Sequence, residues 1–248
     1  MSELSPFRER EPISTDRALA LLAEGDLDIL GRMPYSSNAT FLVDVCHEGV
    51  EAQAIYKPHR GERPLWDFPS GLYQREVAAF VVSDDLGWDL VPPTVVRDDA
   101  PHGTGSLQLF MPARFEEHYY TIRESTDAHD EAFQRICALD IVINNTDRKS
   151  GHCLLGVDDT IWAIDHGVAF HHQYKLRTVI WEFAGEPLPD AVQDDLWRFL
   201  ERGVPAPAVA LLDPLERDAM LTRTTALATA GRFPDDDSGG HRYPWPLV

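Results

Sequence analysis

The chain has 248 residues with 44% hydrophobic content, which is enough to bury one substantial core or two smaller cores that meet at a cleft. Its 22 Lys and Arg residues face 41 Asp and Glu residues, and the net charge of −19 repels nucleic acids and anionic lipid surfaces, so no nucleic-acid partner is expected. No run of 18 apolar residues and no signal-like apolar core occurs, so we expect a cytoplasmic protein without integral membrane association.

The first 110 residues combine helical and strand-like patterns. One helix is predicted over 15–24, where apolar side chains share a face and Gly25 follows the last turn, and a second over 71–86. Five stretches have a strand-like composition: 27–33, 39–46, 50–56, 94–97 and 106–110. The first three predict an antiparallel meander, because a hairpin-like turn at 47–49 joins two of them.

The rest of the chain is mostly helical. Apolar residues at helical spacing occur in three segments: 128–143, 189–201 and 206–230. Two short strands are predicted at 153–156 and 160–164. The fold class is therefore expected to be α+β, with a strand-rich N-lobe over 1–110, a helical C-lobe over 111–248, and a loose tail over about 235–248.

Three polar residues near the middle of the chain suggest phosphoryl transfer. Asp147 follows the helix predicted at 128–143, His152 lies five residues on, and Asp165 follows the second short strand. Phosphoryl transfer from ATP needs a carboxylate near the attacking hydroxyl, and ligands for the magnesium that bridges the phosphates. The alternative is structural: Asp147 caps a loop, Asp165 forms a turn, and His152 is an ordinary surface histidine.

A second pair of charged residues lies upstream. Lys57 ends a predicted strand, and Glu76 lies 19 residues later in a predicted helix. A strand lysine held by a helix glutamate positions the phosphates of ATP in kinases. Taken singly, each residue could be an exposed surface charge, but the order of the four charged residues along the chain favours the kinase interpretation.

The motifs of the middle segment resemble those of a known superfamily. Asn-Thr-Asp-Arg at 145–148 with His152, followed by a hairpin and Asp-His-Gly at 165–167, resembles the DRHxxN and DFG motifs of phosphatidylinositol 3- and 4-kinases. It is also similar to the NxDxxxxN loop of HipA-type protein kinases and to an uncharacterised actinobacterial family described as phosphatidylinositol-kinase-like. The resemblance covers about residues 25–200.

This resemblance implies a two-lobed protein-kinase-like fold that binds ATP and Mg²⁺ between the lobes, with Mn²⁺ as the alternative metal. It implies that Asp147 is the catalytic aspartate, Asp165 the principal metal ligand and His152 the second one. Lys57 would contact the phosphates and Glu76 would hold Lys57. Two residues depart from the pattern, because His152 occupies a position usually taken by Asn, and Lys149 replaces a common His.

A phosphate-covering loop is expected between the first two strands. Ser36, Ser37 and Asn38 could bind phosphate through backbone N–H groups and small side chains. The loop lacks a GxGxxG pattern, so a plain hairpin loop is the competing interpretation.

An adenine-binding hinge is expected where the last N-lobe strand ends. Gln108, Phe110 and Met111 precede Pro112 and are the candidate contacts. An edge strand that stops at proline fits the same residues.

The leading functional hypothesis is an ATP- and magnesium-dependent phosphotransferase that acts on a protein or small-molecule hydroxyl, because the acidity of the chain disfavours an anionic membrane substrate. One alternative is a pseudokinase, a nucleotide-binding or interaction module without turnover. Another is a kinase-like enzyme that transfers AMP. A His/Asp metal centre of a hydrolase, built from Asp165, His166, His171 and His172, is a third, although the spacing matches no standard zinc motif.

Overall fold

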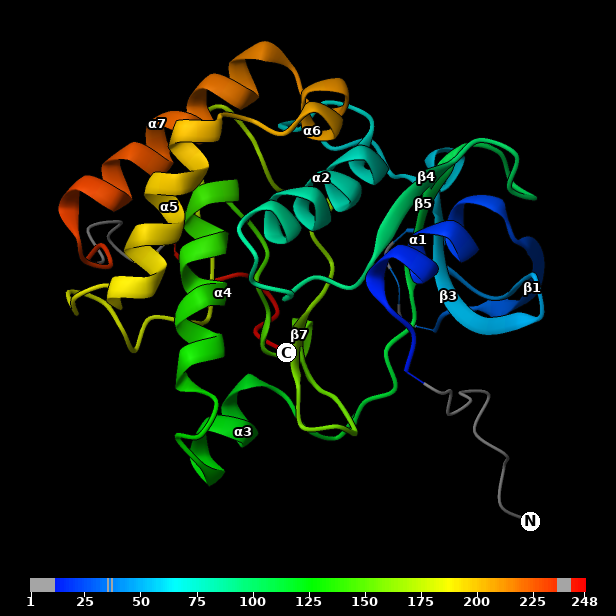
Figure 1. Cartoon of the computed structure of the whole chain (residues 1–248), viewed down its shortest axis with the longest axis horizontal. Helices are drawn as coiled ribbons and strands as arrows, with labels where there is room; N and C mark the ends of the chain where they lie inside the picture. The colour runs from blue at the N-terminus through cyan, green and yellow to red at the C-terminus, as the bar shows by residue number, and fades with distance from the viewer. Residues whose placement is uncertain (1–11, 35, 37, 236–241) are drawn as a thin grey trace.

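The computed structural model describes residues 12–34, 36, 38–235 and 242–248. Five antiparallel strands form one sheet in the order β1-β2-β3-β5-β4 (Figure 1). The strands span these residues: β1 Asp26–Arg32, β2 Phe41–His47, β3 Val50–Pro58, β4 Thr94–Arg97 and β5 Gly105–Leu109. Helix α1 (Thr15–Glu24) packs against this sheet and buries Leu21 and Leu22 with the inward-facing strand residues.

The register of the central strand places Lys57 at the end of the sheet that faces the second lobe. β3 pairs with β2 through a turn at Glu48 and Gly49, both with positive φ, and with β5 so that Lys57 lies opposite Ser106. Residues alternate sides along a strand, so the neighbour Tyr56 enters the lobe core while Lys57 points the other way. The buried sheet core therefore fixes the direction of the lysine.

The second lobe is helical. It contains a 3₁₀ turn, η2 (Ser150–His152), which precedes the small hairpin of β6 (Cys153–Leu155) and β7 (Ile161–Ala163). Another 3₁₀ turn, η1 (His59–Gly61), lies outside this lobe and follows β3 of the sheet. The helices of this lobe are α3 Tyr119–Ser125, α4 Asp130–Ile143, α5 Asp190–Arg202, α6 Ala206–Leu211 and α7 Pro214–Ala230. Helix α4 is buried along nearly all of its last two turns; α7 packs beside it, and α5 packs against α7.

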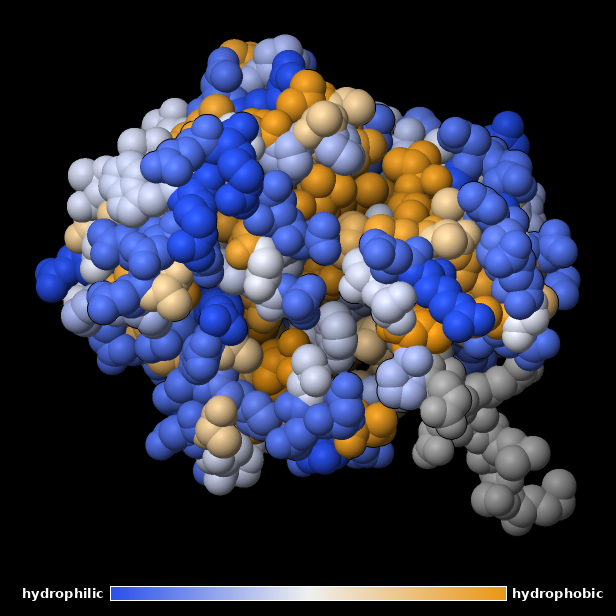
Figure 2. All heavy atoms as spheres, viewed as in Figure 1, coloured by the Kyte–Doolittle hydropathy of each residue, from blue (hydrophilic) through white to orange (hydrophobic). Residues whose placement is uncertain are grey.

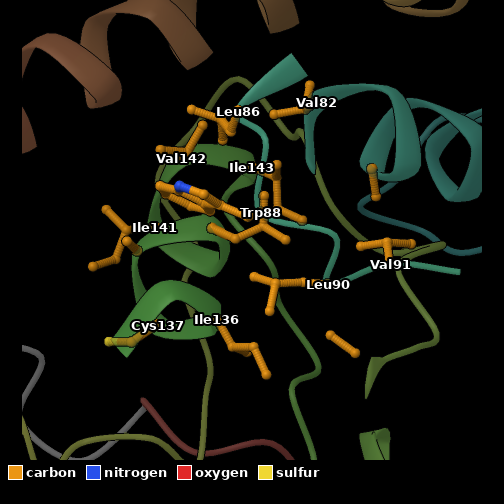
Figure 3. Packing of buried hydrophobic residues seen from close by; sticks show 14 of the residues in the cluster. Val82, Leu86, Trp88, Leu90, Val91, Ile136, Cys137, Ile141, Val142 and Ile143 are labelled. Carbon is orange, nitrogen blue, oxygen red and sulfur yellow. The ribbon is translucent and has the colours of Figure 1, made fainter. Parts of the chain in front are cut away.

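Helix α2 (Leu72–Asp85) belongs to the core of the helical lobe. Its residue Val82 and the segment after it, including Leu86 and Trp88, pack against Ile136 and Val142 of α4 (Figure 3). The side chain of Arg75 is buried, forms an ion pair with Glu216 of α7, and donates to the Ala169 carbonyl at 3.0 Å. Helix α2 also packs against β4 and β5, so it links the sheet to the helical lobe.

The predicted elements are largely observed, with bounds that agree or differ by at most two residues, and the helical segment 206–230 consists of α6 and α7. The exception is α3, which the sequence does not suggest because it is seven residues long and buries only Tyr119 and Ile122. Its N-terminus is closed by His118, whose ring accepts from the Thr121 N–H while the Thr121 hydroxyl accepts from the His118 N–H.

The described part of the C-terminal tail, residues 242–248, is hydrogen bonded to the helical lobe. The carbonyl of Arg242 accepts from the Thr178 N–H at 2.9 Å, and the carbonyl of Leu247 accepts from the Ser150 N–H at 2.8 Å. The weak sequence signals of this tail give no hint of these contacts.

Hydrophilic residues cover most of the face in Figure 2, and apolar residues gather along the junction of the two lobes. None of the helices in the described part of the chain is long and apolar enough to cross a bilayer.

Candidate active site

Lys57, Glu76 and Asp165 meet at the junction of the lobes. The Lys57 Nζ donates to Glu76 Oε1 at 2.5 Å and to Asp165 Oδ1 at 2.8 Å, and the other Glu76 oxygen accepts from the His166 N–H at 2.9 Å. These residues come from strand β3, helix α2 and the segment after β7. The structure therefore brings the strand lysine, the helix glutamate and the second aspartate into one ionic network that spans the lobes.

The opposite charges of this network stabilise the ionised forms of Lys57 and Asp165. Burial works against the charge of Lys57, but the Asp165 and Glu76 carboxylates outweigh it and raise the pKa of the lysine. The nearby Lys57 ammonium holds the pKa of Asp165 well below its ordinary value. Burial raises the pKa of Glu76, against the pull of Lys57. Asp165 adopts φ 61°, a conformation that costs a non-glycine residue about 1 kcal/mol or more, so the surrounding structure must hold it there.

Arg148 fixes the loop that carries Asp147. Its side chain is fully buried, and its guanidinium bonds the Asp140 carboxylate of α4 and, at 3.0 Å, the carbonyls of His152 and Ile164. It also lies 2.7 Å from His166 Nε2. Because an arginine only donates, His166 Nε2 accepts this bond. The Arg148 side chain therefore links the loop after α4 to the segment that carries Asp165.

Asp147 is partly buried beside Lys149, the residue that replaces a common His in the motif the sequence resembles. Lys149 Nζ lies 3.0 Å from Asp147 Oδ2. Burial raises the pKa of Asp147, and the hydrogen bond and charge of Lys149 oppose this rise. In an extended loop, residues two apart point the same way, so the spacing of Asp147 and Lys149 is the signal that could have identified the pair.

The His152 ring and the Asp165 carboxylate face each other across a short distance. His152 Nδ1 lies 2.9 Å from the Asp147 carbonyl, which can only accept, and 3.5 Å from the Lys149 N–H; the shorter contact favours a proton on Nδ1. Burial lowers the pKa of His152 to about 4, more than the Asp165 carboxylate raises it, so the neutral ring presents a lone pair at Nε2. That atom lies 3.4 Å from Asp165 Oδ2, another electron-pair donor.

Two adjacent ligands of one octahedral ion, each about 2.1 Å from it, are about 3 Å apart, close to this separation. Among the described residues, no three His, Cys, Asp or Glu side chains converge as a metal site. Mg²⁺ nevertheless fits the Asp165 carboxylate, because this ion is usually bound by one or two carboxylates and completes its shell with water and phosphate oxygens. The imidazole of His152 is a ligand that softer ions prefer, so it is the weaker of the two donors for Mg²⁺.

The predicted nucleotide contacts have partners within the protein. Asn38 Oδ1 accepts from the Arg63 N–H at 3.0 Å, and the buried Gln108 side chain donates to Thr94 Oγ1 at 2.9 Å. The Phe110 N–H donates to the Gln53 carbonyl at 2.9 Å.

Ser36 lies half-buried in its loop and Met111 half-buried against the N-lobe core, whereas Ser37 lies outside the described residues. The nucleotide contacts of the loop and of the hinge remain predictions.

The histidines of the hydrolase alternative do not converge on Asp165. His166 Nε2 is paired with the Arg148 guanidinium, while His171 and His172 stack on each other at 4.5 Å. His171 also packs edge-on against Phe68, at 5.1 Å between ring centroids. A His/Asp hydrolase centre is therefore not formed by these residues.

The architecture is that of a kinase-like fold: an antiparallel sheet lobe, a helical lobe, and a lysine–glutamate pair and two aspartates at their junction. No family model matches the chain. The solved structure of hydra Fam20 with sugar is similar over 85% of this chain and 86% of that chain, with a TM-score of 0.56 and 13% identity. The Helicobacter pylori proinflammatory kinase CtkA is similar over 85% and 94%, with a TM-score of 0.48 and 11% identity.

The chain belongs to the same family as Protein Rv2133c of Mycobacterium tuberculosis (strain ATCC 25618 / H37Rv). The two are 37% identical over 264 aligned positions, which cover 92% of this chain and 94% of that protein.

Proposed function

We propose that the protein is an ATP- and magnesium-dependent phosphotransferase that moves the γ-phosphoryl group of ATP to a hydroxyl. The observation that carries this proposal is the ionic network of Lys57, Glu76 and Asp165 across the lobe junction. A buried glutamate that orients a lysine, together with a carboxylate on the other lobe, is the arrangement that phosphoryl transfer requires. Membership of the phosphatidylinositol 3- and 4-kinase superfamily is part of the proposal, on the motifs at 145–148 and 165–167.

Each residue has a distinct role in this proposal. Lys57 binds phosphate oxygens, and Glu76 keeps its ammonium in place. Asp165 and His152 would hold the metal, which supplies positive charge to the phosphates when it is bound. Asp147 orients the acceptor hydroxyl and takes its proton, and its raised pKa suits a general base.

One observation favours a second candidate, a nucleotide-binding protein without transfer. The Lys149 ammonium lies 3.0 Å from the Asp147 carboxylate, and an ion-paired carboxylate is a weaker proton acceptor. In the transferring enzyme, Lys149 instead moves to the phosphoryl group when ATP and the acceptor are bound, which frees Asp147.

ATP labelled separately at the α and γ positions tests the proposal and its alternatives. The purified chain is incubated with Mg²⁺ and a mixture of candidate protein and small-molecule acceptors. Label transferred only from the γ position supports phosphotransfer, and label from the α position identifies AMP transfer. Bound but unconsumed nucleotide identifies the pseudokinase, and no nucleotide binding with Mg²⁺ or Mn²⁺ rejects all three functions.

A further inference from the structure

A cavity of about 840 Å³ lies beside the candidate active site, and none of the residues given a role in phosphotransfer lines it. One wall is the segment 66–69, between β3 and α2, and the other is the segment 171–177, which follows Asp165 and His166 in the chain. Small-molecule sites in proteins occupy about 300–1,000 Å³, so the cavity has the size of a site for a compound of low molecular mass.

The second wall is paired directly with the loop of Asp147. The Arg177 N–H donates to the Asn145 carbonyl at 2.9 Å. The Arg148 N–H donates to the Arg177 carbonyl at 3.0 Å, and the Arg148 carbonyl accepts from the Val179 N–H at 3.1 Å, which makes a parallel bridge between Arg148 and Thr178. Arg148 and Thr178 are buried, and side chains alternate along extended backbone. The preceding residues, Asp147 and Arg177, are therefore neighbours across this pairing, on the face opposite Arg148 and Thr178.

The cavity has an unpaired cation. The Arg177 side chain is exposed, and its guanidinium forms no ion pair or hydrogen bond with another described residue. Lys175 differs, because its Nζ bonds the Asp67 carboxylate at 3.1 Å and lies 5.3 Å from the centre of the Phe68 ring. With Asp67 neutralised in this way, Arg177 gives the cavity a net positive charge in a chain of net charge −19.

Aromatic side chains provide the rest of the lining. Trp66 is 97% exposed and Tyr174 is 60% exposed, although both are large rings that ordinarily lose water on folding. Phe68 also lines the cavity and packs against His171. The cavity thus combines exposed rings with one free guanidinium.

We infer that this cavity binds the acceptor substrate, and that the acceptor is a small hydroxyl compound with a phosphate or carboxylate group. This inference rests on the proposed phosphotransfer. Arg177 binds the anionic group, the rings cover the apolar part, and the hydroxyl lies at Asp147. The acceptor oxygen bonds to the γ-phosphorus of ATP while the bond from that phosphorus to the β–γ bridging oxygen breaks, so ADP leaves with that electron pair and Asp147 takes the hydroxyl proton.

The test measures anion binding with the nucleotide site already occupied. The full chain is saturated with Mg²⁺ and adenylyl imidodiphosphate, whose own binding is recorded first by calorimetry. Inorganic phosphate and acetate, the minimal forms of the two anionic groups, are then titrated separately while the side-chain N–H signal of Arg177 is followed by NMR and the affinity by calorimetry. The comparison set is wild type, Arg177→Gln, Arg177→Lys and Arg17→Gln, the last of which removes an equal exposed charge from the N-lobe.

We expect at least one anion to bind the wild type and Arg17→Gln equally, and to bind Arg177→Gln about tenfold more weakly, the usual loss for a hydrogen bond to a charged group. Arg177→Lys should fall between them. If the nucleotide binds but neither anion does, or if Arg177→Gln binds both as wild type does, the inference is overturned and the proposed function stands. Phosphatidylglycerol vesicles are titrated in a parallel experiment, and binding to them alone would identify a lipid surface and also overturn the inference. Failure to bind nucleotide would overturn both proposals.

Discussion

His152 should make the protein sensitive to mild acid. Its pKa is lowered from an ordinary 6.5 to about 4, with burial as the main cause, while the unfolded chain keeps the ordinary value. Below pH 6.5 the unfolded state therefore binds a proton that the folded state rejects, so the free energy of unfolding falls as the pH falls from 6.5 to 4. The full difference is about 3 kcal/mol, and about 2 kcal/mol of it should be lost between pH 7 and pH 5.

Urea denaturation of wild type and His152→Asn at pH 7 and pH 5 measures this effect, because Asn can still donate to the Asp147 carbonyl but does not titrate. The other histidines, including the buried His166, are common to both proteins and cancel in the comparison. The variant should lose about 2 kcal/mol less stability than wild type between the two pH values. His102→Asn, at an exposed position, is the matched control and should follow wild type. Equal losses in wild type and His152→Asn would refute the lowered pKa of His152 and with it a ring that stays neutral in mild acid.

Three further predictions follow from the same contacts. Lys57→Met should weaken binding of ATP and Mg²⁺ in calorimetry by tenfold or more, and Glu76→Gln less, since Lys57 touches phosphate and Glu76 only orients it; a stronger effect of Glu76→Gln would contradict these roles. Lys149→Ala should leave nucleotide affinity within about twofold and lower the rate of γ-label transfer, because Lys149 is proposed to contact the transferred group. A faster rate would instead mean that Lys149 only neutralises Asp147. Arg148→Met should lower the free energy of unfolding by about 3–5 kcal/mol because it leaves the buried Asp140 carboxylate without its counter-charge, with only the hydrogen bonds from Asn145 and Thr178, and an unchanged urea midpoint would refute that account.

Much of the fold could be predicted from local patterns. The helix over 15–24 has an apolar face, a serine cap and a terminal glycine, and the observed α1 has the same bounds. The strand at 94–97 and the hairpin turn at 47–49 also carry their own signals in β-branched residues and in glycine. Local chemistry was sufficient wherever one face of an element is buried and the other exposed.

The sequence does not indicate how helix α2 is held. The helix is buried on nearly all sides, and its buried set includes Arg75 and Glu76, so no apolar stripe shows which lobe it packs against. Its ion pair with Glu216 joins residues 141 positions apart in the chain. The parallel bridge that brings Arg177 beside Asp147 is likewise a tertiary pairing without a local signature, so the cavity could not be anticipated from either segment alone.

In the proposed mechanism, Asp165 binds the metal ion of the nucleotide and Asp147 acts in the transfer step. The most direct test measures calorimetric binding of ATP with Mg²⁺ and γ-label transfer in Asp165→Asn, Asp147→Asn and wild type. Asp165→Asn should bind the metal-nucleotide at least tenfold more weakly, because the phosphates lose a metal ligand, whereas Asp147→Asn should bind normally and transfer at less than about 1% of the wild-type rate, the usual scale for loss of a general base. Wild-type binding and transfer in both variants would contradict the assignment.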